Sequence, residues 1–329
     1  MTSKTYINPV YDGYFADPFV LRHRTGYYAY GTNDRVDATH AFEVLRSDDL
    51  VSWSSLGRAL PAVEGLRACD HWAPEVAEHE GRFYMYFSAG VDDREHALRV
   101  AVADRPEGPF STMGGSLTPH ERFAIDASPF RDDDGQWYLY YARDWLEGER
   151  VGTSLVVDRL VGMDRLAGEP VPVLGATADW QLYRRQRQMY GKVYDWHTLE
   201  GPFVVKRLGR YWCLYSGGAW TSAGYGVSWA VADHPLGPFS EPLTDGPALL
   251  RTRPGQVLGP GHNSVVVGPD GQDYLVYHAW DSAQTARRMF IDRLDWTEEG
   301  PLTAAPTTTA QPAPERPSML PEISPDGSD

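Results

Sequence analysis

The sequence predicts an all-β fold, a five-bladed β-propeller, because one hairpin pattern recurs along the chain. A short apolar strand, a glycine turn and an alternating aromatic strand occur together five times. The five units start near residues 16, 72, 125, 200 and 262. Repeated hairpins of this kind are typical of propellers, in which the blades start at a shared central channel. Helical periodicity is weak throughout the chain.

The second strand of each unit is the clearest element. These strands are rich in aromatic and apolar residues that favour β structure, and they end at polar or small residues. They are expected at Tyr27–Tyr30, Phe83–Phe87, Trp137–Tyr141, Tyr211–Leu214 and Tyr274–His278. Asp134-Gly135 and Asp270-Gly271 are predicted hairpin turns, because glycine tolerates the positive φ that such turns need.

A second repeat also indicates equivalent blades. Ala103–Phe110 reads Ala-Asp-Arg-Pro-Glu-Gly-Pro-Phe, and Ala232–Phe239 reads Ala-Asp-His-Pro-Leu-Gly-Pro-Phe. Each segment follows an apolar strand. We therefore expect both to occupy the same place in different blades.

The predicted domain organisation is one propeller over residues 1–303 and a tail over 304–329. All-β propellers commonly reach this length as a single unit. The last part of the chain is rich in Pro, Thr and Ala, with acidic residues, and cannot bury enough apolar surface to order itself. Thr177–Tyr194 has little strand character and is interpreted as an insertion that leads into Glu200 and lines a cleft.

Charge and cysteine content narrow the partners and the compartment. A net charge of −15 disfavours nucleic acid and anionic lipid as partners. No window approaches the ~18 apolar residues of a membrane span. Cys69 and Cys213 make no disulfide framework. Met1–Tyr6 lacks the apolar core of a secretory signal, so a cytoplasmic protein is expected, with a leader upstream of Met1 as the alternative.

Acidic residues lie at three of the strand starts. Asp17, Asp126 and Glu200 are far apart in sequence. Equivalent strand starts meet at the channel of a propeller, so these three carboxyls are expected to come together. Three carboxyls around one channel indicate a hydrolase site.

Six segments in order resemble glycoside hydrolase family 43, a family of five-bladed propellers that includes β-xylosidases, α-L-arabinofuranosidases and arabinanases. The resemblance covers roughly residues 8–303. The matching segments are Ala16–Pro18, His71–Glu75, Ile125–Ala127, Thr198–Pro202, Gly259–Ser264 and Arg287–Trp296. Any one of them is a weak signal, whereas their common order is a strong one.

The resemblance implies a role for each carboxyl. Asp17 matches the family's general base, Glu200 its general acid, and Asp126 a third carboxyl that orients the acid and raises its pKa by like-charge repulsion. Hydrolysis with inversion needs the acid and base ~6.5–9.5 Å apart, so that a water fits between them. Taken singly, Asp17 also fits a turn before Pro18, Asp126 a strand cap and Glu200 a solvated loop residue.

Four further residues are predicted to bind substrate. Arg287 matches an arginine that contacts the cleaved sugar, and strand alternation should send Arg288 to the opposite face. Trp72 is either a core residue or a platform for a sugar ring. His262 binds substrate, holds a water or metal in the channel, or satisfies buried backbone. Glu75 is expected to make a structural or sugar hydrogen bond.

No cofactor is expected to be required. The sequence has no His-Glu-x-x-His motif and no paired-cysteine motif of a catalytic metal site. Relatives in the family place a calcium ion or a water near the histidine that His262 matches. A structural calcium ion in the central channel is therefore an open alternative.

The sequence thus predicts an inverting exo-glycosidase that removes terminal α-L-arabinofuranose or β-D-xylose from short plant-cell-wall oligosaccharides. Exo action is inferred from the missing secretion signal. Ala38–Phe42 and Thr177–Tyr194 are expected to choose the sugar, and the oligomeric state is left open.

Three alternatives remain open. A retaining fructosidase of the same clan would start with Asn-Asp-Pro-Asn, where this chain has Phe15–Pro18. A phosphorylase would need phosphate for turnover. A carbohydrate-binding propeller would bind sugar without turnover. A protein-interaction propeller is disfavoured, because its Trp-Asp and Gly-His repeat signatures are absent.

Overall fold

The computed structural model describes residues 4–33, 40–61, 70–92, 94–242 and 244–315. Within these ranges the regular structure consists of β-strands and one 3₁₀ turn, Asp179–Gln181. The predicted all-β class is therefore confirmed. No helix in the described ranges is long and apolar enough to cross a membrane.

Three antiparallel sheets have four strands each, paired in sequence order. The first is β2 (Ala16–His23), β3 (Gly26–Thr32), β4 (His40–Ser47) and β5 (Ser54–Pro61). The second is β6 (Asp70–His79), β7 (Arg82–Val91), β8 (Arg94–Ala103) and β9 (Ser111–Met113). The third is β19 (Leu258–Val267), β20 (Asp273–Trp280), β21 (Arg287–Thr297) and β22 (Gly300–Leu302).

A nine-stranded sheet contains two further antiparallel runs. The first run is β10 (Ala124–Arg131), β11 (Trp137–Trp145) and β12 (Gly152–Gly162), with β13 (Arg165–Leu166) and β14 (Val171–Leu174) beside β12. The second is β16 (Lys192–Arg207), β17 (Arg210–Gly217) and β18 (Gly226–Ala232), with β15 (Leu182–Met189) beside β16. A short parallel pairing of β12 with β16 joins the two runs.

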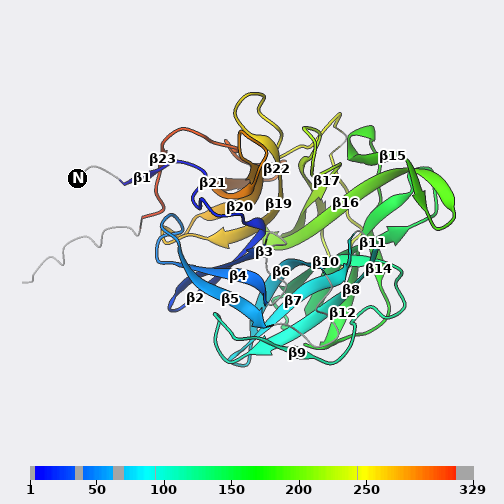
Figure 1. Cartoon of the computed structure of the whole chain (residues 1–329), viewed down its shortest axis with the longest axis horizontal. Helices are drawn as coiled ribbons and strands as arrows, with labels where there is room; N and C mark the ends of the chain where they lie inside the picture. Colours follow the sequence, from blue (N-terminus) through cyan, green and yellow to red (C-terminus); the bar gives the residue numbers. More distant parts are fainter. Residues whose placement is uncertain (1–3, 34–39, 62–69, 93, 243, 316–329) are drawn as a thin grey trace, which may run out of the picture.

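The sheets lie around a common centre (Figure 1). Their first strands contact one another in a closed cycle, from β2 to β6, β10, β16, β19 and back to β2. This arrangement fits a β-propeller. The blade count of five stays a prediction, because hydrogen bonding merges two of the runs into one sheet.

Each of these first strands has the same irregularity. The pairing register shifts there, as in a β-bulge, and a residue with positive φ lies at the shift. The five residues are Asp17 (φ 50°), Ala73 (φ 48°), Asp126 (φ 61°), Gly201 (φ 55°) and His262 (φ 49°). Asp17 and Asp126 are thus structurally equivalent, whereas Glu200 precedes the equivalent position by one residue.

The second repeat does occupy equivalent places. The Tyr30 hydroxyl donates a 2.6 Å hydrogen bond to the Pro106 carbonyl, and the Tyr140 hydroxyl donates a 2.5 Å bond to the Pro235 carbonyl. Phe110 meets Tyr30 edge-on, and Phe239 meets Tyr140 in the same way. Each segment therefore packs against the second strand of the preceding hairpin by the same contacts.

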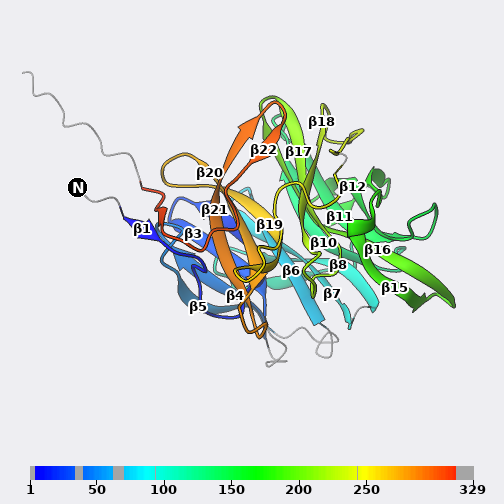
Figure 2. The ribbon, with the colours of Figure 1, turned by 90° about the horizontal axis from the view of Figure 1, so that it is seen from above.

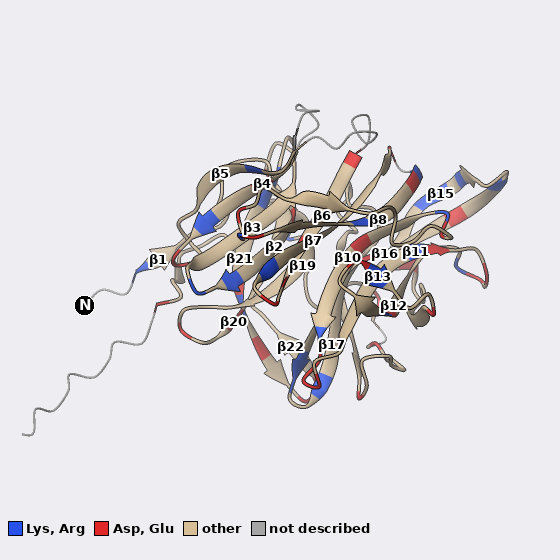
Figure 3. Ribbon diagram, turned by 90° about the horizontal axis from the view of Figure 1, so that it is seen from below, with Lys and Arg blue, Asp and Glu red and all other residues tan. Residues whose placement is uncertain are grey.

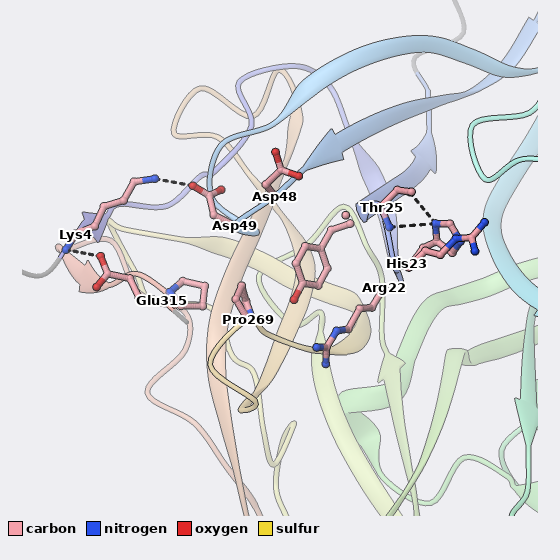
Figure 4. A pocket seen from close by; sticks show the side chains of 12 residues that line it. Lys4, Arg22, His23, Thr25, Asp48, Asp49, Pro269 and Glu315 are labelled. Atoms are coloured by element: carbon pink, nitrogen blue, oxygen red, sulfur yellow. Dashed lines mark hydrogen bonds and ion pairs between the residues drawn. The ribbon is translucent and has the colours of Figure 1, made fainter. Parts of the chain in front are cut away.

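The expected tail does not begin at residue 304. β23 (Gln311–Pro312) pairs with β1 (Thr5–Tyr6), and the Lys4 amide donates to the Glu315 carboxylate at 2.9 Å (Figure 4). Thr307 is buried and donates a 2.5 Å hydrogen bond to the Asp292 carboxyl. Hydrogen bonds to buried groups order this segment, so its low apolar content was a poor guide. Residues 316–329 lie outside the described ranges.

The insertion also differs from expectation, since it forms a strand. β15 pairs with β16, and this hairpin projects from the body of the molecule (Figures 1 and 2). Three arginines, Arg184, Arg185 and Arg187, belong to β15, which carries the blue of basic residues in Figure 3. The segment is polar and lacks the usual apolar alternation of a strand. It is nevertheless held in β structure because its backbone pairs with the long strand β16.

Candidate active site

One cavity of about 340 Å³ gathers the three carboxyls predicted from the strand starts. Asp17 comes from β2, Asp126 from β10 and Glu200 from β16. Trp72, His262 and Arg287 also line the cavity, as do Tyr14, Thr32, Asn33, Ile125 and Trp220. Six of the seven residues singled out in the sequence therefore lie in one place.

Asp17 is buried among imidazole and guanidinium groups. Its Oδ1 lies 3.2 Å from Arg287 Nη1, 3.3 Å from His278 Nδ1 and 3.5 Å from His262 Nδ1. Burial alone would raise the pKa of Asp17. The charge of Arg287 nevertheless holds that pKa well below its ordinary value. Asp17 is therefore a carboxylate throughout the neutral range.

Glu200 has the opposite environment. Burial raises its pKa to about 7, and the Asp17 charge acts in the same direction. The Tyr225 hydroxyl donates a 2.5 Å hydrogen bond to Glu200 Oε1 and opposes this rise, as does Arg287. Glu200 therefore carries a proton for a large part of the time near neutral pH and can donate it.

Asp126 links β10 to β16, the strand that carries Glu200. Burial, followed by the charges of Glu200 and Asp17, raises the pKa of Asp126 well above its usual value. The Gly201 amide donates a 2.9 Å hydrogen bond to Asp126 Oδ2 and acts in the opposite direction. Simultaneous ionisation of Asp126 and Glu200 is unfavourable, so the pair retains a proton at neutral pH.

Arg287 lines the cavity and is held there by two aromatic residues. Its Nη2 and Nε donate to the Tyr14 hydroxyl at 2.8 and 3.1 Å, and its guanidinium lies 4.5 Å from the centre of the Trp220 ring. Arg288 instead pairs with Asp281 at 3.3 Å. The predicted alternation along β21 is confirmed, and it turns Arg287 toward the carboxyls.

Two tryptophans form aromatic walls. Trp72 stacks on His96, with 3.7 Å between ring centres, and Trp220 stacks on Trp280 at 5.7 Å. Both tryptophans also line the cavity. One face of each indole thus packs against protein, which orients the ring. Trp72 is therefore partly packed, as in the core interpretation, and also borders the cavity, as in the platform interpretation.

A smaller pocket of about 80 Å³ adjoins the cavity at Glu200. The two spaces share Trp72, Ile125, Glu200 and Trp220. The smaller one is also lined by Phe123, Asp144, Thr153, Tyr183, Arg187, Met189, Trp196 and Thr198. Since Tyr183, Arg187 and Met189 belong to β15, the insertion does line the cleft, as predicted.

Arg187 is the central charged group of this smaller pocket. It is buried, and its guanidinium lies 5.2 Å from the Tyr183 ring centre and 5.0 Å from that of Trp196. Asp144 is nearby, and burial raises the pKa of that carboxyl to about 6. The pocket therefore combines aromatic surface with fixed hydrogen-bonding groups, as a sugar-binding site requires.

Glu75 is the exception among the predicted residues. It lies beyond the bulge of β6 and lines neither space. Burial raises its pKa well above the usual value, and Ser128 is its hydrogen-bonding neighbour. This placement favours the structural interpretation of Glu75 over contact with a sugar.

Several residues of the site carried no clear sequence signal. Tyr225 and Trp220 follow β17 in a segment without repeat character. Tyr14 precedes β2. His278 was visible only as the end of an aromatic strand, although its register places it opposite Gly261, beside the bulge of the last hairpin. An alignment of the five hairpins on their bulges would have identified it.

The described ranges contain no group of three or more His, Cys, Asp or Glu arranged to hold a metal ion. His262 Nδ1 faces Asp17 Oδ1, and the Arg287 charge acts on this histidine. Burial lowers the pKa of His262, which keeps the imidazole neutral. The channel calcium stays a prediction.

Cys69 and residues 34–39, which include Ala38, lie outside the described ranges.

The larger hollow of about 790 Å³ shown in Figure 4 shares no lining residue with this cavity. Its wall includes the ion pair of Lys4 with Asp49 and the exposed side chain of Arg24. It contains none of the buried carboxyls, so its size does not make it the chemical centre.

A buried carboxylate, a carboxyl with a raised pKa and a third carboxyl share one aromatic-walled cavity. This is the arrangement of an acid–base hydrolase that acts on sugars. The family model "Glycosyl hydrolases family 43" matches residues 6–302. The chain therefore belongs to glycosyl hydrolase family 43 and is an O-glycosidase by family.

Individual relatives agree on the family and differ in the sugar they are named for. The chain is 31% identical to the β-D-galactofuranosidase xynD of Aspergillus niger, with 89% of this chain and 83% of the relative covered. It is 26% identical to an extracellular exo-α-(1→5)-L-arabinofuranosidase of Streptomyces avermitilis, over 91% of this chain and 63% of the relative.

A solved structure supports the same fold. The crystal structure of a thermostable family-43 glycoside hydrolase matches with a TM-score of 0.81 and 33% identity. The match covers 94% of this chain and 99% of the other. The propeller-like fold of this chain thus agrees with the fold of a solved member of its family.

Proposed function

We propose that this protein is an inverting exo-glycosidase that releases terminal α-L-arabinofuranosyl or β-D-xylosyl residues from plant-cell-wall oligosaccharides. The observation that carries the proposal is the position of Glu200, whose raised pKa suits a proton donor, at the junction of two pockets. Asp17, which is held ionised, lines only the larger one. The closed cycle of first strands supports a count of five blades.

The two carboxyls divide the chemistry between them. Asp17 accepts a proton from a water that attacks the anomeric carbon, and Glu200 protonates the glycosidic oxygen as the bond breaks. In the reactive state the proton shared by Asp126 and Glu200 is on Glu200, and the negative charge then carried by Asp126 favours this protonated acid. Arg287 holds Asp17 in place through the hydrogen bond to Oδ1. Direct attack by water inverts the anomeric configuration.

In this proposal each of the two pockets takes one sugar. The cleaved residue occupies the larger cavity with Asp17, Asp126 and Arg287, and the glycosidic oxygen lies at Glu200. The leaving sugar enters the smaller pocket, where Tyr183, Arg187 and Trp196 contact it. The small volume of this second pocket supports contact with one leaving unit.

A terminal β-D-galactofuranosyl residue is a second candidate substrate. It is favoured by the 31% identity to the Aspergillus niger enzyme named for that sugar. α-L-Arabinofuranose and β-D-galactofuranose share the five-membered ring and its substituent orientations, and they differ by one exocyclic hydroxymethyl group. A cavity that accepts one of them needs only room for that group to accept the other.

The test is a panel of p-nitrophenyl α-L-arabinofuranoside, β-D-xyloside and β-D-galactofuranoside, with the matching disaccharides, for wild type and Glu200→Ala. We expect wild-type turnover of at least one sugar and a collapse of disaccharide cleavage in the variant. Proton NMR of the first product should show the inverted anomer. Binding without turnover would support the carbohydrate-binding alternative, and turnover only with phosphate would support a phosphorylase.

A further inference from the structure

The bulge residues of the five first strands, with one exception, make the same hydrogen bond between sheets. In four of them the backbone amide donates to a side chain on the second strand of the preceding hairpin. These bonds join Ala73 to Thr32 Oγ1 (2.8 Å), Asp126 to Ser88 Oγ (2.9 Å), His262 to Ser216 Oγ (2.7 Å) and Asp17 to His278 Nδ1 (3.1 Å).

The acceptors occupy one register position. Each lies opposite the residue that precedes the bulge residue of its own hairpin. The pairs are Ala16 with Thr32, Trp72 with Ser88, Glu200 with Ser216 and Gly261 with His278. The repeated bond is therefore a property of the backbone arrangement, and the side chain at this position decides whether it can form.

The hairpin of β10 and β11 breaks the pattern. Its residue at the acceptor position, opposite Ile125, is Ala142, which has no acceptor atom on its side chain. The amide that would reach it belongs to Gly201, and this amide donates instead to Asp126 Oδ2 at 2.9 Å. The exception falls at the one bulge that directly follows the residue proposed as the acid, Glu200.

Gly201 itself is suited to this arrangement. Its φ of +55° is left-handed, and an added Cβ would lie 3.2 Å from the His262 ring. With no side chain at 201 and only a methyl group at 142, the Asp126 carboxylate can reach across to the next strand. The bond ties the Asp126 side chain to the backbone beside Glu200.

We propose that Ala142 is a positioning residue: by offering no acceptor, it directs the Gly201 amide to Asp126, which keeps Asp126 charged and the proton on Glu200. The hydrogen-bond part of the proposal stands on the geometry alone. Its catalytic consequence rests on the proposed function, in which Glu200 is the acid.

The first test is Ala142→Ser, which supplies the hydroxyl found at the equivalent Ser88 and Ser216. The Gly201 amide should then turn to the new hydroxyl, and Asp126 should lose a donor that favours its ionised form. The shared proton moves toward Asp126, so Glu200 loses its proton at lower pH. We expect the alkaline limb of kcat/KM to fall by about one pH unit.

Leaving-group dependence should separate this effect from general damage. Cleavage of a disaccharide needs the acid, so on the alkaline side its kcat should drop by about tenfold, which is the loss that moving the limb by about one pH unit produces. A 2,4-dinitrophenyl glycoside needs little acid assistance and should change much less. Ala142→Gly adds no acceptor, and Ala142→Cys adds bulk with only a weak one. Both controls should keep the wild-type alkaline limb.

A readout independent of turnover is the amide proton of Gly201 in ¹⁵N-labelled protein. In wild type its chemical shift should follow the titration of Asp126, and in Ala142→Ser this dependence should be lost. An unchanged titration in a folded Ala142→Ser protein would overturn the proposal. If that variant does not fold, Asp126→Asn should abolish the titration of the Gly201 amide and move the alkaline limb to lower pH. A titration that persists, or an alkaline limb that stays at its wild-type pH, would overturn the proposal.

Failure of the proposed function and failure of the proposed role of Ala142 are distinguishable. A wild-type protein without turnover defeats the proposed function, while the Gly201 titration still decides the hydrogen-bond assignment. Wild-type turnover combined with equal pH profiles for Ala142→Ser and Ala142→Gly defeats the role of Ala142 and leaves the glycosidase assignment intact.

Discussion

The surroundings of Asp17 and of Glu200 differ although both carboxyls are buried in one cavity. Asp17 faces a guanidinium and two imidazoles, whereas Glu200 faces a tyrosine hydroxyl and lies near other carboxyls. Burial pushes both pKa values upward, but only Asp17 has enough positive charge nearby to reverse the effect. Neighbouring charge, rather than burial, therefore separates the two groups into base and acid.

Asp17→Asn should cause the greatest loss of activity and is the most direct challenge to this contrast. The amide cannot accept a proton from water, so kcat should fall by about 10²–10⁴-fold for every leaving group. Steady-state kinetics on an activated aryl glycoside and on a disaccharide would check this. A loss confined to the disaccharide would contradict the assignment of Asp17 as the base.

Glu200→Gln should give a loss that depends on the leaving group. Disaccharide cleavage should fall by about 10²–10⁴-fold, because the glycosidic oxygen is no longer protonated. A 2,4-dinitrophenyl glycoside should be affected far less, and the alkaline limb of its pH profile should disappear. Equal losses on both substrates would place Glu200 outside the acid role.

Arg187→Met tests the second pocket and should have a smaller effect. The thioether keeps much of the bulk but removes the donors, so KM for a disaccharide should rise by about 2–10-fold with kcat little changed. An aryl glycoside with one small ring is the control substrate. A change in kcat alone would argue that Arg187 acts on the chemistry and not on the leaving sugar.

Tyr225→Phe refines the contrast between the two carboxyls with only a small change in rate. The Tyr225 hydroxyl lowers the pKa of Glu200, so its removal should raise that pKa above its present value of about 7. Protonated Glu200 then persists to higher pH, and the alkaline limb of kcat/KM should move upward. A downward shift, as expected for Ala142→Ser, would contradict this sign.

The hairpins and their order could be predicted because they rest on local chemistry. Aromatic alternation in segments such as Tyr27–Tyr30 and turns such as Asp134-Gly135 specify strand and reversal within a few residues. Two other segments were misjudged because the same approach sees only near neighbours. β15 and residues 304–315 lack apolar patterning, and pairing partners distant in sequence order them.

Local patterns along the chain were enough to establish the recurring units, the family and the acidic residues at the strand starts. The folded arrangement was needed to show that Tyr225 reaches Glu200, that Arg287 and two histidines surround Asp17, and that Gly201 bonds to Asp126. The two kinds of information differ in range. Strand patterns act between near neighbours, whereas a pKa depends on every charge and dipole within several ångströms, and closure of the ring brings those groups from all parts of the chain.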